Sequence, residues 1–376
     1  MQRREFMKKT AIAGVALAAG TSLFGAAGKS TITCKGYAAF DESGELKPWK
    51  FQRRAVREND ILFEVKATSI CHSDIHTELG HWGKQTYPQV PGHEIVGVVT
   101  EVGSKVTKFK VGDRVGVGCM VDNADVPSLQ GKSEQYDANT VFTYGQSYKA
   151  EPTGISQGGY SDYFVVHEHF AVHLPDDIDF NHAAPLMCAG ITTYSPLMKY
   201  QIKKSDNVGV AGIGGLGHLA VKIALSKGAN VTAFTTTPSK VKDIQSWGAA
   251  AVVVSSPDDL AKFRAKFDYV ISTIPYEFDM MPYIAMVKPF GNFTVVGMPV
   301  NFSQKIQTLA LAATKVNFNA SLIGDMKETQ EMVDYCAKNK IYPEIEIIKA
   351  DEINAAWKKV VNKEARYRFV IDPKTF

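Results

Sequence analysis

Two cysteines and a histidine in this sequence have the residue types of a catalytic zinc site. Cys71 lies 22 residues before His93, and Cys188 follows 95 residues after that histidine. Two thiolates and one imidazole fill three tetrahedral positions on Zn²⁺ and leave the fourth free for water or an alcohol oxygen. Taken singly, each residue is more often a buried packing residue. Together, at spacings too long for a zinc finger or ribbon, they predict ligands drawn from distant parts of a folded chain.

A glycine-rich turn after a β-branched run predicts a dinucleotide site. The turn reads Gly212-Ile213-Gly214-Gly215-Leu216-Gly217, and a helix is expected at residues 218–227, stopped by Gly228. Glycines permit the tight turn and the close approach of a pyrophosphate, whose charge then faces the helix N-terminus. A purely structural turn is the alternative.

The residues after the second expected strand indicate which nicotinamide cofactor fits. An NAD site places an acidic residue there to hold the ribose hydroxyls. This sequence has Thr235, Thr236, Thr237 and Lys240 instead. Hydroxyls and a lysine charge suit a 2′-phosphate. The sequence therefore predicts NADP(H), with an ordinary surface lysine as the alternative for Lys240.

The composition is that of an ordinary globular protein with room for two domains. The chain has 376 residues, of which 45% are hydrophobic and 22% charged. Residues 1–28 hold four of the 42 Lys and Arg and one of the 39 Asp and Glu, so 38 of each sign remain without them. This balance does not favour nucleic acid as a partner. Five cysteines are too few for a disulfide framework, and Cys34, Cys119 and Cys336 are expected to be packing residues.

Residues 1–28 differ in character from the rest of the chain. Arg3 and Arg4 precede two lysines and a weakly apolar run at residues 11–27. This pattern predicts a twin-arginine (Tat) export signal cleaved near Ala27 or Gly28, export of the folded protein by the Tat machinery, and a periplasmic location. A cytoplasmic protein is one alternative. A membrane anchor is the other, but the glycine-interrupted run is short for a bilayer, so no stable membrane insertion is expected.

The pattern of apolar residues changes at about residue 183. Before it, short apolar runs alternate with turns at residues 92–118 and predict compact β-rich structure. After it, helices alternate with short strands, as in a parallel α/β sheet. The strands are expected at residues 208–211, 231–234, 251–254, 269–272, 293–296 and 321–323. An amphipathic helix at 329–338 and an extended run at 366–371 are expected to return to the first domain.

Five segments together resemble the medium-chain zinc dehydrogenases, and in particular the NADP-dependent cinnamyl alcohol dehydrogenase group. They are Cys71-His72-Ser73-Asp74-Ile75-His76, Tyr87-Pro88-Gln89-Val90-Pro91-Gly92-His93-Glu94, Cys188-Ala189-Gly190-Ile191-Thr192-Thr193-Tyr194, the turn at 212–217, and Arg366-Tyr367-Arg368-Phe369-Val370-Ile371-Asp372. The resemblance covers residues 31–373. It implies an α/β protein with a GroES-like β-rich catalytic domain at 29–183 and 325–376. It also implies a Rossmann NADP-binding domain, a doubly wound parallel sheet, at 184–324, and a homodimer.

The resemblance also implies roles for the residues of the zinc site. Zinc held by Cys71, His93 and Cys188 would polarise an aldehyde carbonyl while the nicotinamide delivers hydride to its carbon. Glu94 would occupy the fourth position when substrate is absent.

Three residues that follow Cys71 resemble the proton-handling part of the family site. Ser73 is similar to the first relay hydroxyl, His76 to the group that exchanges protons with solvent, and Asp74 to a residue that supports this region. The alternative for all three is the start of a helix, because Ser and Asp are common caps.

Other residues are placed near the ligands by resemblance alone. Thr192 and Thr273 are expected at the cofactor. Trp82, Met120 and Ile323 are expected at a substrate pocket suited to apolar aldehydes, although each could equally be ordinary core.

One departure from the family pattern concerns a second metal. Related enzymes carry four closely spaced cysteines that hold a structural zinc after the segment matching residues 117–122. Residues 123–137 of this chain contain no cysteine. The sequence therefore predicts one catalytic zinc and no structural zinc. The loss fits export, because four neighbouring thiols would tend to oxidise in a periplasm.

The predicted activity is that of a zinc-dependent NADP(H) alcohol dehydrogenase or aldehyde reductase of broad range, acting on aromatic or aliphatic primary alcohols and aldehydes. Free NADP(H) is expected to be scarce outside the cytoplasm, so one alternative is a dismutase that retains its cofactor and couples oxidation of one alcohol to reduction of another aldehyde. A noncatalytic NADPH-binding protein is another alternative. A polyol dehydrogenase would need a more polar pocket than Trp82 and Met120 suggest.

Overall fold

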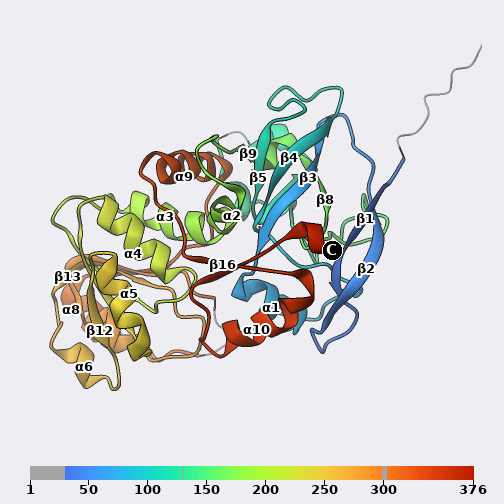
Figure 1. Cartoon of the computed structure of the whole chain (residues 1–376). Helices are drawn as coiled ribbons and strands as arrows, with labels where there is room; N and C mark the ends of the chain where they lie inside the picture. Colours follow the sequence, from blue (N-terminus) through green and yellow to red (C-terminus); the bar gives the residue numbers. More distant parts are fainter. Residues whose placement is uncertain (1–29, 130, 299–302) are drawn as a thin grey trace, which may run out of the picture.

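The computed structural model describes residues 30–129, 131–298 and 303–376 (Figure 1). The predicted export signal at residues 1–28 lies outside the described residues. Within the described ranges, no helix is both long and apolar enough to cross a membrane.

The first sheet is mixed and has seven strands. Its order is β16-β17-β3-β4-β5-β9, and β8 also pairs with β3. The strands are β3 (Asp60–Ser69), β4 (Ile95–Val102), β5 (Arg114–Val117), β8 (Tyr163–His167), β9 (Ala171–His173), β16 (Ile345–Ile348) and β17 (Arg368–Ile371). The strand closest to the C-terminus, β17, runs antiparallel to β3, so the end of the chain lies beside the segment that leads to Cys71.

Two short hairpins and two helices complete this part of the molecule. β1 (Ile32–Ala39) pairs with β2 (Leu46–Arg53), and β6 (Met120–Asn123) pairs with β7 (Thr140–Phe142). Helix α1 (His72–Glu78) follows β3 directly, and α10 (Ile353–Val361) packs against it (Figure 1).

The second sheet is parallel, with the order β12-β11-β10-β13-β14-β15. Its strands are β10 (Asn207–Ala211), β11 (Asn230–Thr235), β12 (Ala250–Val253), β13 (Phe267–Ser272), β14 (Val287–Val295) and β15 (Asn317–Ala320). The chain moves outward in one direction from β10 to β12 and in the other from β13 to β15. This reversal creates a crevice beside the carboxyl ends of β10 and β13, where doubly wound folds bind their ligands.

The helices between β9 and β16 include the two that the sequence predicts near residues 218–227 and 329–338. They are α2 (Phe180–Ala183), α3 (Ala189–Lys199), α4 (Gly217–Ser226), α5 (Val241–Ser246), α6 (Asp258–Ala261), α7 (Met281–Ile284), α8 (Thr308–Thr314) and α9 (Met326–Lys338). Helix α9 begins three residues earlier than expected, because Asp325 and Glu328 form a capping box at its N-terminus.

One expected strand is wrong. Residues 321–323 are not extended, and the sixth strand is instead β15, which ends at Ala320. Ile323 has a φ of 38°, which is incompatible with a strand, because the chain is turning here toward the cap of α9.

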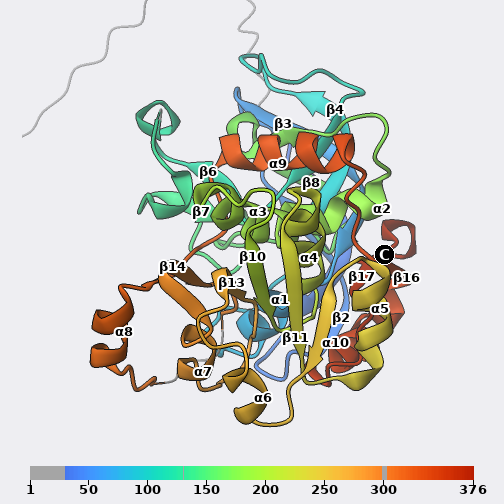
Figure 2. The same cartoon turned by 90° about the vertical axis from the view of Figure 1, so that its left-hand side faces the viewer.

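The two sheets share one apolar core. A single cluster of buried side chains includes Val65 and Ile95 from the first sheet, Val210 from the second and Leu219 from helix α4, which covers it. Helix α3 packs against both α4 and α9 (Figure 2). Cys188 is the N-cap of this helix.

A glycine fixes the segment that carries His93. Gly92 has a φ of 102°, and an added Cβ would lie 2.4 Å from the ring of Tyr160. Backbone hydrogen bonds from Gly158, Gly159 and Tyr160 to Val90, Gly92 and Pro91 hold the two segments together. Only glycine combines this conformation with this close approach.

Candidate active site

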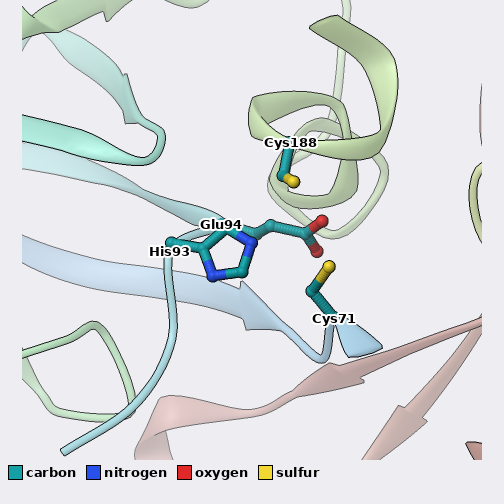
Figure 3. Close-up of side chains that lie close together, drawn as sticks. All are labelled: Cys71, His93, Glu94 and Cys188. Atoms are coloured by element: carbon teal, nitrogen blue, oxygen red, sulfur yellow. The ribbon is translucent and has the colours of Figure 1, made fainter. Parts of the chain in front are cut away.

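The structure brings four predicted metal ligands together. One ligand atom each from Cys71, His93, Glu94 and Cys188 lies within 4.8 Å of the others, and all four residues are buried. Figure 3 shows the carboxylate of Glu94 reaching between the two sulfur atoms, with the His93 ring beside them. Cys71 is the N-cap of α1, Cys188 is the N-cap of α3, and His93 and Glu94 immediately precede β4. The ends of three elements therefore converge on one point.

Two polar atoms at this point have no partner in the described structure. His93 Nε2 and Glu94 Oε1 are buried without a hydrogen bond. Leaving such atoms unsatisfied costs about 1–3 kcal/mol each, so buried atoms of this kind normally have a partner. Two thiols and an imidazole are the donor set that Zn²⁺ prefers. The residues therefore fit a zinc ion, which would satisfy the orphaned atoms.

Asp74 does not line the cleft, but its carboxylate holds two of these ligands in position. His93 Nδ1 lies 2.8 Å from Asp74 Oδ1, and the Cys71 amide donates to Oδ2 at 2.9 Å. The hydroxyls of Tyr144 and Tyr160 donate to the same carboxylate at 2.7 and 2.9 Å. The acceptor at Nδ1 keeps a proton on that nitrogen and leaves the Nε2 lone pair free for a metal. Asp74 is thus a positioning residue, and the capping alternative also holds for it, because it closes the box at the start of α1.

Cys119 was expected to pack in the core, but it lines the cleft beside the ligands. Hydrogen bonds with Cys119 and Cys71 raise the pKa of the Cys188 thiol well above its usual value. The hydrogen bond from Cys188 in turn holds the pKa of Cys71 well below its usual value. Cys119 immediately precedes the pair of strands β6 and β7, and no spacing in the sequence indicated its proximity to Cys188.

The prediction that Met120 lies at the substrate pocket is wrong. Met120 is absent from the lining of the cleft and belongs to the apolar core shared by the two sheets. Cys119 lies in a bend directly before β6, whereas Met120 is the first residue of that strand, so the two neighbours face different surroundings. A one-residue error in this assignment exchanges a cleft residue for a core residue.

Arg368 is a functional candidate that the sequence reasoning missed. Its guanidinium pairs with Glu94, whose Oε2 also accepts from the Ser69 hydroxyl. Burial raises the pKa of Glu94 to about 7, and the charge of Arg368 opposes this effect. A Cβ on Gly215 would lie 2.5 Å from the Arg368 guanidinium, so this cation lies between the ligand cluster and the glycine turn. Its place beside a glutamate distant in sequence could be found only from the fold.

The ligand cluster opens into one cavity of about 580 Å³, within the range of small-molecule sites. Most of the predicted site residues line it: Cys71, Ser73, His76, Trp82, His93, Cys188, Thr192, Gly212, Ile213, Gly214, Gly215, Leu216, Thr235, Thr236, Thr237, Lys240, Thr273 and Ile323. Gly217 and Glu94 lie behind this surface.

The glycine turn has the shape that a pyrophosphate requires. Gly212 has a φ of 87°, and a Cβ on Gly217 would lie 2.0 Å from the Gly212 carbonyl oxygen. A Cβ on Gly214 would meet nothing within 4 Å, so the backbone there is open. Thr273 donates to the Gly212 carbonyl at 2.6 Å and braces the turn. Helix α4 begins at Gly217, directly after this opening.

Lys240 is not a surface lysine. Its side chain is only 5% exposed, and its Nζ donates to the Ile213 carbonyl at 2.8 Å. Burial lowers its pKa to about 8, with a further contribution from the charge of Arg366. Thr235, Thr236 and Thr237 lie beside it along the cavity wall. A cation and hydroxyls therefore meet at the carboxyl end of β11.

Comparison with known proteins agrees with this geometry. Residues 57–176 match the model of the alcohol dehydrogenase GroES-like domain, and residues 215–338 match that of the zinc-binding dehydrogenases. The chain is 43% identical over 345 residues to "NADP-dependent alcohol dehydrogenase C 1" of Mycolicibacterium smegmatis, with 90% of this chain and 98% of the relative covered. The chain belongs to the zinc-dependent medium-chain dehydrogenases of the cinnamyl alcohol dehydrogenase group.

Two further relatives support the same assignment for this dehydrogenase. A "probable mannitol dehydrogenase" of Mesembryanthemum crystallinum is 43% identical over 341 residues, covering 90% of this chain and 94% of the relative. The solved structure of a cinnamyl alcohol dehydrogenase from Sorghum bicolor superposes with a TM-score of 0.87 at 36% identity, covering 91% of this chain and 98% of that one. The expected fold class and the expected oxidoreductase class are confirmed. The two alternatives, a dismutase and a noncatalytic binding protein, receive no support.

The hydrogen bonds of Asp74 predict how zinc binding depends on it. We expect Asp74→Asn to weaken zinc affinity about 10- to 100-fold, because the amide no longer offers His93 and Cys71 a full carboxylate. Tyr144→Phe removes only one of the hydrogen bonds and should weaken affinity less. Competition with a chromophoric chelator measures both. Asp176→Asn, at a fully exposed side chain, is the matched control. Equal affinity in the Asp74 variant and this control would contradict the role.

Proposed function

We propose that this enzyme transfers hydride between NADP(H) and a primary alcohol or aldehyde of broad range, aromatic or aliphatic. The observation that carries the proposal is the single cavity, which joins the ligand cluster to the glycine turn and to Lys240. A cofactor lying along the turn would bring its reactive end toward the ligands, as hydride transfer requires.

Different residues around the cavity bind the zinc and transfer the proton. Zinc, when bound by Cys71, His93 and Cys188, supplies a Lewis acid for the substrate oxygen, and the nicotinamide supplies the hydride carrier. The Ser73 hydroxyl accepts the proton released by an alcohol hydroxyl and gives up its own proton in the same step. His76, three residues further along the same face of α1, passes it on. Aldehyde reduction uses the same residues in reverse.

The walls of the cavity favour apolar substrates. Trp82, Phe142, Leu322 and Ile323 are among its lining residues. Burying an aromatic or aliphatic side group against them stabilises binding, whereas several hydroxyls of a polyol would need partners of their own. One relative is called a probable mannitol dehydrogenase, so mannitol is the informative competing substrate.

Cofactor preference and substrate class are tested together. We expect turnover of benzaldehyde and cinnamaldehyde with NADPH, much slower turnover with NADH, and none of mannitol with NADP⁺. Lys240→Ala should lower kcat/KM for NADPH about 10- to 100-fold and leave that for NADH nearly unchanged, because a charged hydrogen bond to the 2′-phosphate is lost. Lys242→Ala, exposed two residues further on, is the control. Equal use of both cofactors by the unmodified enzyme would refute the preference.

The proposal includes a single zinc per chain. The segment that lacks cysteines is held by other contacts: Asn123 Nδ2 donates to Asp137 and Thr140, both at 3.1 Å. His169 pairs with Glu134 at 2.8 Å, and Glu134 also accepts from the Met326 amide at 3.2 Å. These contacts support folding of this segment without a second metal.

Metal analysis of the purified protein tests this stoichiometry. We expect one tightly bound zinc per chain, and close to none in Cys71→Ala, because each site needs its full ligand set. Cys336→Ala, in helix α9 and outside the ligand cluster, should keep its zinc. Two tightly held zincs in the unmodified protein would contradict the prediction of a single zinc per chain.

A homodimer is also proposed, formed through the outer edge of the second sheet. Strand β15 is the last strand of that sheet. Nearby, Leu309 and Phe290 are 81% and 75% exposed, and no residue of helix α8 is buried (Figure 2). Large exposed apolar side chains at a strand edge favour pairing with a second copy.

Light scattering coupled to size exclusion measures the oligomeric state. We expect the unmodified protein to be a dimer and the double variant Leu309→Asp, Phe290→Asp to be a monomer, since buried charges oppose association. Val111→Asp, 61% exposed on another part of the molecule, should remain dimeric. An unmodified protein that runs as a monomer would contradict the proposal.

Export through the twin-arginine route is proposed from Arg3, Arg4 and the apolar run after them. Folded export would let the protein acquire its metal before it leaves the cytoplasm. We expect fractionation to recover the protein in the periplasm. The double variant Arg3→Lys, Arg4→Lys should stay in the cytoplasm at full length. Cytoplasmic recovery of the unmodified protein would refute export.

A further inference from the structure

We propose that His81 is the solvent end of the proton path of this enzyme and exchanges protons with His76 through their Nδ1 atoms. The inference rests on the proposed function and deepens it. Sequence resemblance placed solvent exchange at His76 itself, but that side chain is only 5% exposed. It faces a cavity that substrate and cofactor fill during turnover, so a second group is needed to connect it to bulk water at that stage.

The contact between the two histidines is direct. His76 Nδ1 lies 2.9 Å from His81 Nδ1, within hydrogen-bonding distance. The His81 amide donates to the His76 carbonyl at 2.9 Å, which fixes the turn after α1 so that the two rings face each other. The ring centroids are 5.2 Å apart. Two imidazoles joined in this way share one proton between them, with one ring donating and the other accepting.

The two residues lie on opposite sides of the cavity wall. His76 lines the cavity, and its Nε2 is buried without a partner in the described part of the chain. His81 is exposed and is not among the cavity residues. Trp82 packs over His76, with ring centroids 5.2 Å apart. The pair is thus a polar connection from the cavity to the outside.

The surroundings of His76 make it a transfer group rather than a proton store. Burial lowers the pKa of His76 to about 4, and the charges of His72 and His81 add to this effect while Cys71 opposes it. The His72 ring stacks on His76 at 4.6 Å and meets Tyr276, over which Lys363 lies. Glu78, further along α1, is bonded to Gln89. His76 therefore transfers a proton that reaches its Nε2 and does not retain it.

The proton balance of the step is complete. In alcohol oxidation, His76 Nε2 accepts one proton from the cavity side while the Nδ1 proton of His76 passes to His81 Nδ1. His81, now an imidazolium, releases one proton to water. His76 is left as its other neutral tautomer. After the product leaves, water in the cavity removes the Nε2 proton, while His81 takes one proton from bulk water and returns one to His76 Nδ1, so the net release is one proton for each alcohol oxidised. Aldehyde reduction runs the transfer in the opposite direction.

Single-turnover proton release tests the path. The zinc-loaded enzyme is mixed with NADP⁺ and benzyl alcohol in weak buffer with a pH-indicator dye, while NADPH formation is followed separately. We expect His81→Ala and His81→Gln to slow proton release about tenfold or more. Added imidazole should restore both. The glutamine retains an acceptor for the His76 hydrogen bond but cannot carry a proton. His182→Ala, another partly exposed histidine, is the matched control.

Each outcome decides the proposal. Slow release in both variants with rescue by imidazole supports it. Unchanged release in His81→Ala overturns it, as does full recovery in His81→Gln, which would indicate a structural role. Loss of zinc or of NADPH affinity in both variants also overturns it. Failure of the unmodified enzyme to form NADPH from any alcohol would instead count against the proposed function, so the two failures are distinguishable.

Discussion

The active site depends on one buried carboxylate. Asp74 is fully buried and accepts hydrogen bonds from His93, from the Cys71 amide and from the hydroxyls of Tyr144 and Tyr160. A charge in this position is stable only because so many donors surround it. In return, it fixes two zinc ligands that come from separate segments. The same carboxylate closes the capping box of α1, so it also positions the helix with Ser73 and His76 relative to the ligands.

A second charge links the site to the cofactor side. Arg368, from the last strand of the first sheet, pairs with Glu94 and lies against Gly215 of the glycine turn. Breaking a buried pair of this kind leaves an uncompensated charge, so the two residues constrain each other strongly. Together with the apolar core shared by both sheets, this pair links the ligand cluster to the cofactor turn. The cavity between them is therefore a property of the whole chain.

The sequence was most informative where chemistry limits the choice of residue. Thiolates and an imidazole are ligands that zinc favours, so Cys71, His93 and Cys188 could be selected from their type and spacing. Only glycine permits the turn at 212–217, and only an acid at the end of β11 would have indicated NAD. The predictions from sequence were wrong where the answer depended on the surroundings that each side chain faces. Met120 and Cys119 exchange roles, and the strand expected at 321–323 lies a few residues earlier as β15.

The sequence by itself determined the ligand set, the glycine turn, the class of fold and the family, because these follow from local residue types. Only the tertiary structure decided which side chains meet. It placed Arg368 beside Glu94, Cys119 beside Cys188, and the buried His76 against the exposed His81. The first two are contacts between residues far apart in the chain, and the third depends on a turn whose geometry no pattern specifies. Side-chain contacts of this kind arise from the packing of separate elements, which residue spacing alone does not encode.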